Sequence, residues 1–121
     1  MDRKQKSENV TGSLDGNILS VAIRGEIDHH TAKSLRGKID EKMYAARPKT
    51  VLLDVGEVTF MDSSGLGLLL GRFTVARVLG SEFRIVSPSD SVKKILDLAG
   101  ADKLITIEEN QNSVRKERSQ K

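Results

Sequence analysis

The chain has 121 residues, enough for one domain with its own core and too few for two. It has no cysteine, which excludes disulfides, thiolate metal sites and thiol catalysis, and three Phe and one Tyr offer little for stacking nucleic-acid bases. The net charge of +3 is unevenly placed: residues 8–109 hold 13 basic and 15 acidic side chains, and the two ends hold 7 and 2. We therefore expect a domain at 8–109, disordered basic tails at 1–7 and 110–121, and no nucleic-acid partner.

The chain lacks the sequence features of a membrane or secreted protein. No apolar run approaches the ~20 residues that a membrane-spanning helix needs. The charged residues Met1–Ser7 are not followed by the apolar stretch of a secretory signal. We therefore expect a cytoplasmic protein with no membrane partner.

The domain begins with a predicted hairpin followed by a helix. Short β-type runs at residues 10–13 and 18–24 flank the turn sequence at 15–17. Asp28 then caps a helix that ends near Arg47, because Pro48 disfavours a helical conformation in the residue before it. The apolar positions of this helix are Ala32, Leu35, Ile39, Met43 and Ala46.

Strands and helices alternate through the rest of the domain. Residues 50–55 form a nearly continuous apolar run, typical of a strand buried on both faces. The later elements are a helix from Ser63 to about Leu79, a strand at 82–86, a helix from Pro88 to Gly100 and a strand at 104–107. Helical crossovers between strands predict an α/β domain whose mixed sheet has a parallel core and an N-terminal hairpin.

The segment from Phe60 to Arg72 is the most informative part of the chain. Asp62, Ser63 and Ser64 stand at the start of a helix, where side-chain oxygens accept from backbone N–H groups that lack partners. Three glycines follow, and each costs a helix roughly 0.5–1 kcal/mol relative to alanine. They are Gly65, Gly67 and Gly71. We expect either the sheet beneath or a partner above to approach this helix closely.

The apolar residues of the same helix form two stripes. The first can pack on the sheet and comprises Leu66, Leu69, Leu70, Phe73 and Ala76. The second lies on another side and comprises Leu68, Gly71, Val75 and Leu79. The second stripe either lies under a neighbouring element or forms an exposed apolar patch that binds a protein.

Motifs for catalysis and for cofactor binding do not fit the segment. A nucleophile elbow needs glycine two residues before its serine, where Ser63 has Met61 and Ser64 has Asp62. The glycines lie inside a leucine-rich helix and no lysine follows, which is unlike a nucleotide-binding loop. The adjacent pair His29-His30 would point about 100° apart on a helix, with no thiolate or ordered carboxylates to complete a metal site. We expect no enzyme activity, no metal and no cofactor.

Phosphorylation is the chemistry that suits Ser63. A phosphate adds about −1.5 to −2 charges, which a helix N-terminus tolerates and a packed interface does not. The residues alone leave two interpretations open: a phosphorylated switch, or serines that only cap the helix.

The segment Phe60–Gly67 resembles the signature of the STAS domain, the fold of bacterial anti-sigma factor antagonists. Gly25–Ala32 is similar to the loop and helix start of the sporulation type, which acts on the anti-sigma-F factor, and Leu70–Arg72 agrees with it. The likeness extends over most of Val10–Ile107, and the basic tails depart from it.

The resemblance implies a mechanism called partner switching. The unphosphorylated antagonist binds an anti-sigma factor kinase and frees the sigma factor, phosphorylation by the kinase ends the binding, and a serine phosphatase reverses it. The family's phosphorylated serine matches Ser63. Two acidic residues that contact the partner or orient the serine match Asp28 and Asp62. The partner surface so implied comprises Asp28, Asp62, Ser64, Gly65, Leu66, Gly67, Leu68, Gly71 and Arg72. We expect a regulator that is monomeric when free; the alternative is a STAS module of a general-stress or transporter-associated system.

Overall fold

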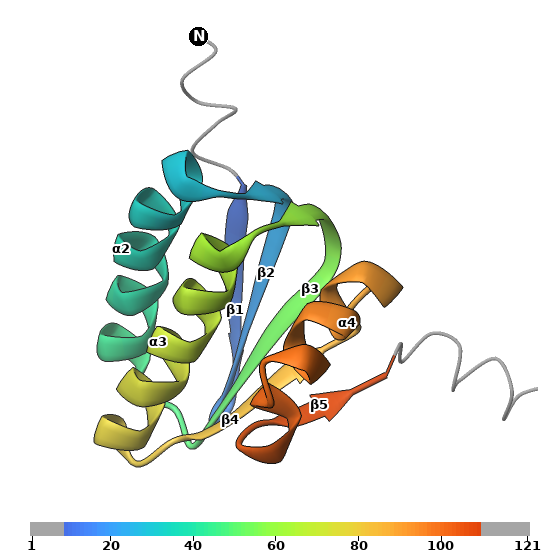
Figure 1. Ribbon diagram of the computed structural model, residues 1–121. Helices are drawn as coiled ribbons and strands as arrows, with labels where there is room; N and C mark the ends of the chain where they lie inside the picture. The colour runs from blue at the N-terminus through green and yellow to red at the C-terminus, as the bar shows by residue number, and fades with distance from the viewer. Residues whose placement is uncertain (1–8, 110–121) are drawn as a thin grey trace, which may run out of the picture.

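The chain folds into a five-stranded sheet with helices over one of its faces (Figure 1). A computed structural model describes residues 9–109, so the predicted tails lie outside the described residues. The elements are β1 (Val10–Asp15), β2 (Ile18–Ile27), α2 (His29–Ala46), β3 (Thr50–Met61), α3 (Ser63–Leu79), β4 (Glu82–Val86), α4 (Asp90–Leu98), the 3-10 helix η1 (Ala101–Lys103) and β5 (Thr106–Glu108).

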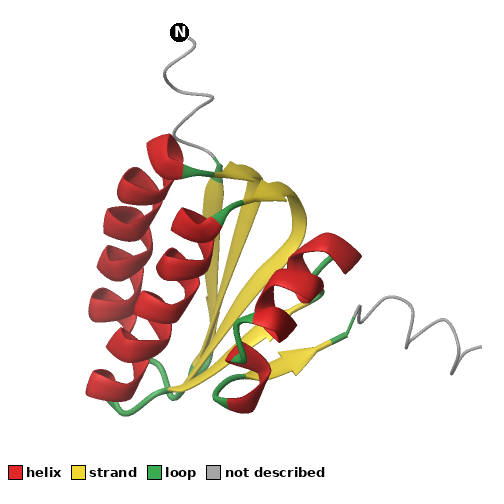
Figure 2. Cartoon of the chain, in the orientation of Figure 1, coloured by secondary structure: helices red, strands yellow, loops and turns green. Residues whose placement is uncertain are grey.

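The strands lie in the sheet in their sequence order, β1-β2-β3-β4-β5. β1 runs antiparallel to β2, and every later pair is parallel. Because right-handed crossovers between successive parallel strands all pass on one side, α2, α3 and α4 cover the same face (Figure 2). The predicted α/β class, mixed sheet and N-terminal hairpin are confirmed.

This one-sided cover corrects the prediction for residues 50–55. Val51, Leu53 and Val55 are buried under the helices, whereas the alternate residues of the strand are only half-buried. The strand therefore has one covered face, and the prediction that it is buried on both faces is wrong.

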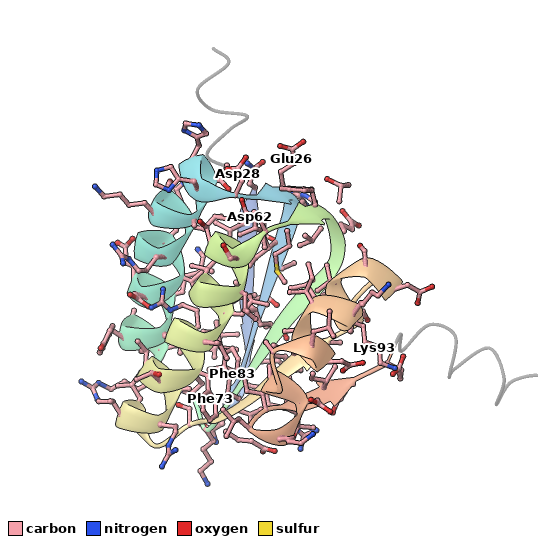
Figure 3. All side chains as sticks on the ribbon, viewed as in Figure 1. Glu26, Asp28, Asp62, Phe73, Phe83 and Lys93 are labelled. Atoms are coloured by element: carbon pink, nitrogen blue, oxygen red, sulfur yellow. The ribbon has the colours of Figure 1, made fainter. Side chains whose placement is uncertain are left out.

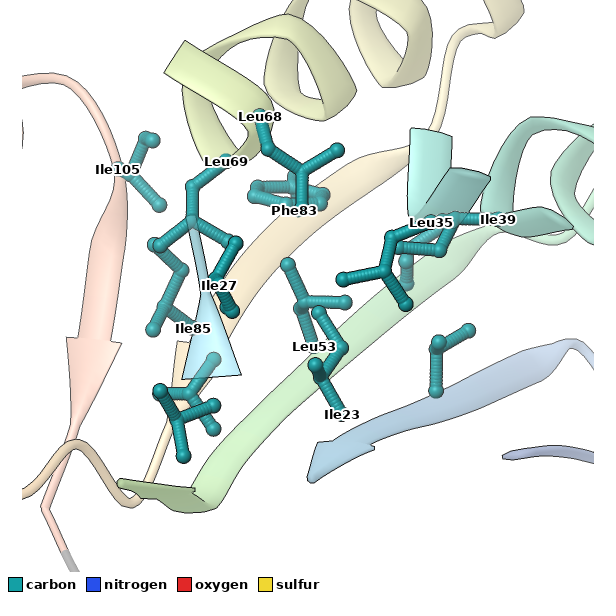
Figure 4. Close-up of a cluster of buried hydrophobic side chains, with 14 of the residues drawn as sticks. Ile23, Ile27, Leu35, Ile39, Leu53, Leu68, Leu69, Phe83, Ile85 and Ile105 are labelled. Atoms are coloured by element: carbon teal, nitrogen blue, oxygen red, sulfur yellow. The ribbon is translucent and has the colours of Figure 1, made fainter. Parts of the chain in front are cut away.

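The core lies between the sheet and the three helices (Figure 4). Ile23, Leu53 and Ile85 contribute from three neighbouring strands and are fully buried. Ile39 from α2 and Leu69 from α3 pack against them and are also fully buried. The predicted apolar face of α2 is confirmed, because its buried residues are Leu35, Ile39 and Met43.

The predicted end of α2 near Arg47 is confirmed, and two other element ends differ from the prediction for local reasons. Arg47 ends α2 in the left-handed region, with φ of 44°, because the following Pro48 disfavours a helical conformation there. α4 begins at Asp90, with Ser89 as its N-cap, rather than at Pro88. The last strand starts at Thr106, since residues 101–103 form a 3-10 turn that leaves Leu104 exposed. No helix within residues 9–109 is long and apolar enough to span a membrane.

Candidate functional site

Two helix starts lie side by side at one end of the sheet. Ile27 at the end of β2 pairs in register with Met61 at the end of β3. The Asp62 N–H donates to the Ile27 carbonyl at 3.3 Å. Asp28 and Asp62 are the residues that follow these two strands, so both helices begin at the same edge of the sheet, beside Glu26 (Figure 3).

The start of α2 is closed by a complete capping box. The Asp28 carboxylate accepts from the His30 N–H at 2.9 Å and from the Thr31 N–H at 3.0 Å. In return the Thr31 hydroxyl oxygen accepts from the Asp28 N–H at 3.0 Å, and the same hydroxyl donates to the Glu26 carbonyl. The pKa of Asp28 is lowered, and the hydrogen bond from the Thr31 N–H is the largest cause. Partial desolvation of the carboxylate opposes this, and the bond from the His30 N–H adds to it.

The start of α3 is capped by an acid and leaves its serine free. The Asp62 carboxylate accepts from the Ser64 N–H at 2.9 Å and from the Gly65 N–H at 3.3 Å. Ser63 is exposed, and its hydroxyl forms no hydrogen bond with any residue in the range 9–109. The interpretation that Ser63 and Ser64 serve as caps is therefore wrong, because Asp62 performs that role.

The three glycines of α3 have different surroundings. A Cβ on Gly65 would collide with Met61 Cγ and lie 3.0 Å from the Ile27 carbonyl oxygen, so the end of the sheet requires a glycine there. A Cβ on Gly67 or Gly71 would meet no atom within 4 Å. The expected close approach is thus made by the sheet at Gly65, and the surface above the other two is open.

A groove of about 680 Å³ separates the first turns of α2 and α3. The α2 side carries mainly basic and imidazole side chains, and the α3 side carries three small residues together with Leu68 and Arg72. The lining residues are His29, His30, Ala32, Lys33, Arg36, Ser64, Gly67, Leu68, Gly71 and Arg72.

Arg72 lies at the bottom of this groove and is only 5% exposed. Its Nε is 3.0 Å from Asp40 Oδ1 on α2, a charge contact whose orientation does not meet hydrogen-bond geometry. Nη1 of Arg72 is buried without a hydrogen-bond partner in the part of the chain that the structure describes. Burial lowers the pKa of Arg72, Asp40 raises it, and nearby Arg36 lowers it further.

The residues of the partner surface that the resemblance implies differ in burial. Gly65, Leu68 and Arg72 are buried, so they shape the surface and offer a partner little contact area. Gly67 is exposed and the remaining predicted residues, Asp28, Asp62, Ser64, Leu66 and Gly71, are half-buried.

The second apolar stripe of α3 is covered rather than exposed. Leu68 is 5% exposed, and Val75 and Leu79 are partly buried against the core. The neighbouring helix α2 packs against α3 along this side. Of the two interpretations left open, cover by neighbouring elements applies to Leu68, Val75 and Leu79, while Gly71 borders the open groove.

Sequence reasoning missed the basic wall of the groove. His29, Lys33 and Arg36 recur at the i, i+4, i+7 spacing of one helix face, which was the available signal. No group of His, Asp or Glu side chains suited to a metal ion occurs within residues 9–109.

Comparison with known proteins identifies the family. A family model for the STAS domain matches residues 12–114. The anti-sigma F factor antagonist of Paenibacillus polymyxa is 34% identical over 94 residues, which cover 78% of this chain and 80% of the relative.

Solved structures share the fold. The anti-sigma factor antagonist SpoIIAA in its unphosphorylated form matches with a TM-score of 0.70 at 23% identity, over 91% of this chain and 96% of that one. The Bacillus cell fate determinant SpoIIAA in the phosphorylated form matches with a TM-score of 0.65 at 22% identity, over 88% and 97%. With the family model spanning most of the sequence and a relative matched over four fifths of its length, the chain belongs to the STAS-domain family, alongside anti-sigma factor antagonists.

Proposed function

We propose that this protein is an anti-sigma factor antagonist whose binding is switched off by phosphorylation of Ser63. The observation that carries the proposal is the free, exposed Ser63 hydroxyl beside a cap that Asp62 already supplies. Such a serine can be modified without the loss of any bond that holds the fold. The antagonist relatives and the phosphorylated form of SpoIIAA support the same role.

In the proposed cycle the unphosphorylated protein binds an anti-sigma factor kinase and the sigma factor is released. The kinase then transfers the γ-phosphoryl group of ATP: a bond forms from Ser63 Oγ to phosphorus, the bond to ADP breaks, and the hydroxyl proton passes to a base of the kinase. A serine phosphatase restores the hydroxyl by hydrolysis. This protein is the substrate in both steps and needs no catalytic group of its own. Because sigma factors act in the cytoplasm, the proposed role is a cytoplasmic one.

The switch works through charge. The phosphate stands at the N-terminus of α3, where the helix dipole favours an anion although Asp62 already accepts from the Ser64 and Gly65 N–H groups, so the fold needs no rearrangement. At an interface the same charge is desolvated or faces an acid of the partner. A hundredfold loss of affinity empties the complex and corresponds to about 2.7 kcal/mol.

The test is phosphorylation of the purified protein by a cognate anti-sigma kinase with ATP, followed by mass spectrometry. One phosphate on Ser63 is expected, with none on the Ser63→Ala variant and an unchanged yield on the control Ser64→Ala. Ser63→Ala should bind the kinase and resist release by ATP. Equal phosphorylation of Ser63→Ala would overturn the assignment and point to Ser64.

Backbone amide shifts separate a charge switch from a conformational one. Phosphorylation should move signals from Asp62 to Gly67 and around Asp28, and leave the centre of β3 unchanged. Large shifts at Val51 to Asp54 would contradict the electrostatic account.

A further inference from the structure

The cations that line the groove between α2 and α3 outnumber the carboxylates that pair with them. Lys33, Arg36 and Arg72 line it, against the single carboxylate of Asp40. Lys33 and Arg36 are exposed and form no ion pair within residues 9–109. A negative group placed among these three cations would be attracted to all of them.

Arg72 adds a third, buried cation to the groove. It is nineteen-twentieths buried, and its Nη1 has no hydrogen-bond partner in the described part of the chain. A carboxylate is the anion that a guanidinium prefers, so the charge of Arg72 favours a carboxylate placed in the groove. Arg36 also lies close enough to lower the pKa of Arg72, and an anion between them would relieve this repulsion.

The edge of the groove limits which anion can enter. Glu26, Asp28 and Asp62 stand at the same end of the molecule (Figure 3), and residues 9–109 hold more acids than bases. A polyanion such as nucleic acid would meet these carboxylates over its length. The open space above Gly67 and Gly71 instead admits a side chain carried by another protein surface.

We propose that this basic groove receives a carboxylate side chain of the anti-sigma factor, which anchors the complex beside Ser63. The inference rests on the proposed function, since it names the chemistry of that partner. The surface then has two signs of charge, because the basic groove lies beside the acidic edge formed by Glu26, Asp28 and Asp62. Such a pattern fixes the orientation of docking.

The first experiment measures affinity for the cognate anti-sigma factor by calorimetry. The double variant Lys33→Gln/Arg36→Gln should weaken binding about tenfold, which is roughly 1.4 kcal/mol. The control Lys94→Gln/Lys103→Gln changes net charge equally at exposed positions outside the groove and should bind within about twofold of the unchanged protein. Equal affinities for the two double variants would overturn the inference and leave the proposed function intact.

The second experiment tests whether the groove binds a carboxylate in the absence of the anti-sigma factor. Labelled protein is titrated with acetyl-Glu-Glu-amide, with acetyl-Gln-Gln-amide, and with inorganic phosphate. The glutamate peptide should move the amide signals of Gly67 and Gly71 and the Nε–H signal of Arg72, the glutamine peptide should not, and Lys33→Gln/Arg36→Gln should abolish the effect. No response to the glutamate peptide, or saturation by phosphate at lower concentration, would overturn the proposal. If the unchanged protein responds here but fails to bind any anti-sigma factor, the proposed function fails and the carboxylate partner is another protein.

Discussion

Gly65 and Gly67 are two residues apart on α3 and serve opposite purposes. Gly65 faces the ends of β2 and β3, where an added methyl group would collide with Met61 and Ile27. Gly67 faces the groove, where the same methyl group would touch nothing. The comparison shows that a glycine in a helix marks either a neighbour that is already present or a space left for one. Only the three-dimensional surroundings distinguish the two cases.

Substitution of Gly65 should give the largest effect on stability. In Gly65→Ala the Cβ needs both the buried Met61 side chain and the Ile27 backbone to move, which overpacking data put at about 1–3 kcal/mol. Urea denaturation of the variant measures the loss. A stability equal to that of the unchanged protein would show that the helix start can shift away from the sheet, and the contrast with Gly67 would disappear.

Removal of the Asp40 carboxylate should give the next largest effect. Asp40→Ala leaves the buried Arg72 charge without its counter-ion, and because Asp40 is 28% exposed we expect a loss of about 1–2 kcal/mol, less than for a fully buried pair. Arg72→Met keeps the length and apolar contacts of the side chain, and it should be close to neutral. Unfolding free energies of the two variants check this, and a more harmful Arg72→Met would mean that the guanidinium itself stabilises the groove.

Gly67→Ala should change stability in the opposite direction from Gly65→Ala. Alanine is about 0.5–1 kcal/mol better than glycine inside a helix, and no atom within 4 Å opposes the methyl group. The unfolding midpoint should therefore rise, while affinity for the anti-sigma factor should fall if the partner occupies the open space. A variant that gains stability and binds equally well would show that the partner does not approach Gly67.

The smallest effect concerns acid stability and tests the closed start of α2. The pKa of Asp28 is lowered from 3.8 in the folded protein, so the unfolded state binds its proton more readily. The stability from this carboxylate is fully present above pH 3.8 and is lost as the pH falls through the lower folded-state value. The difference in unfolding free energy between the unchanged protein and Asp28→Asn should thus shrink below about pH 4. A difference that stays constant from pH 6 to pH 3 would contradict the capping geometry.

Much of this architecture could be predicted from sequence because local chemistry decides it. Asp28 caps a helix as its residue type favours, and Gly80 ends α3 in the left-handed conformation, with φ of 77°. The alternation in residues 18–24 and the helical spacing of Leu35, Ile39 and Met43 identify the faces that meet in the core.

The features that escaped prediction depend on contacts between distant segments. Arg72 is buried although a charged side chain is expected at the surface. Its charge is balanced by Asp40 on the neighbouring helix, which the sequence alone does not reveal. The role of Gly65 depends on Ile27 and Met61, which the β2–β3 register brings together. The basic groove likewise exists only because α2 and α3 pack side by side.

The hydrogen bond from the Asp62 N–H to the Ile27 carbonyl ties both helix starts to one pair of strands. A surface held in this way has little conformational freedom to lose when a partner docks, so association costs little ordering entropy. For the same reason, the helix start that carries Ser63 has little freedom to move an added charge away from an unfavourable contact. The rigidity of the platform should therefore appear in kinetics: modification shortens the lifetime of the complex far more than it slows the encounter of the two proteins.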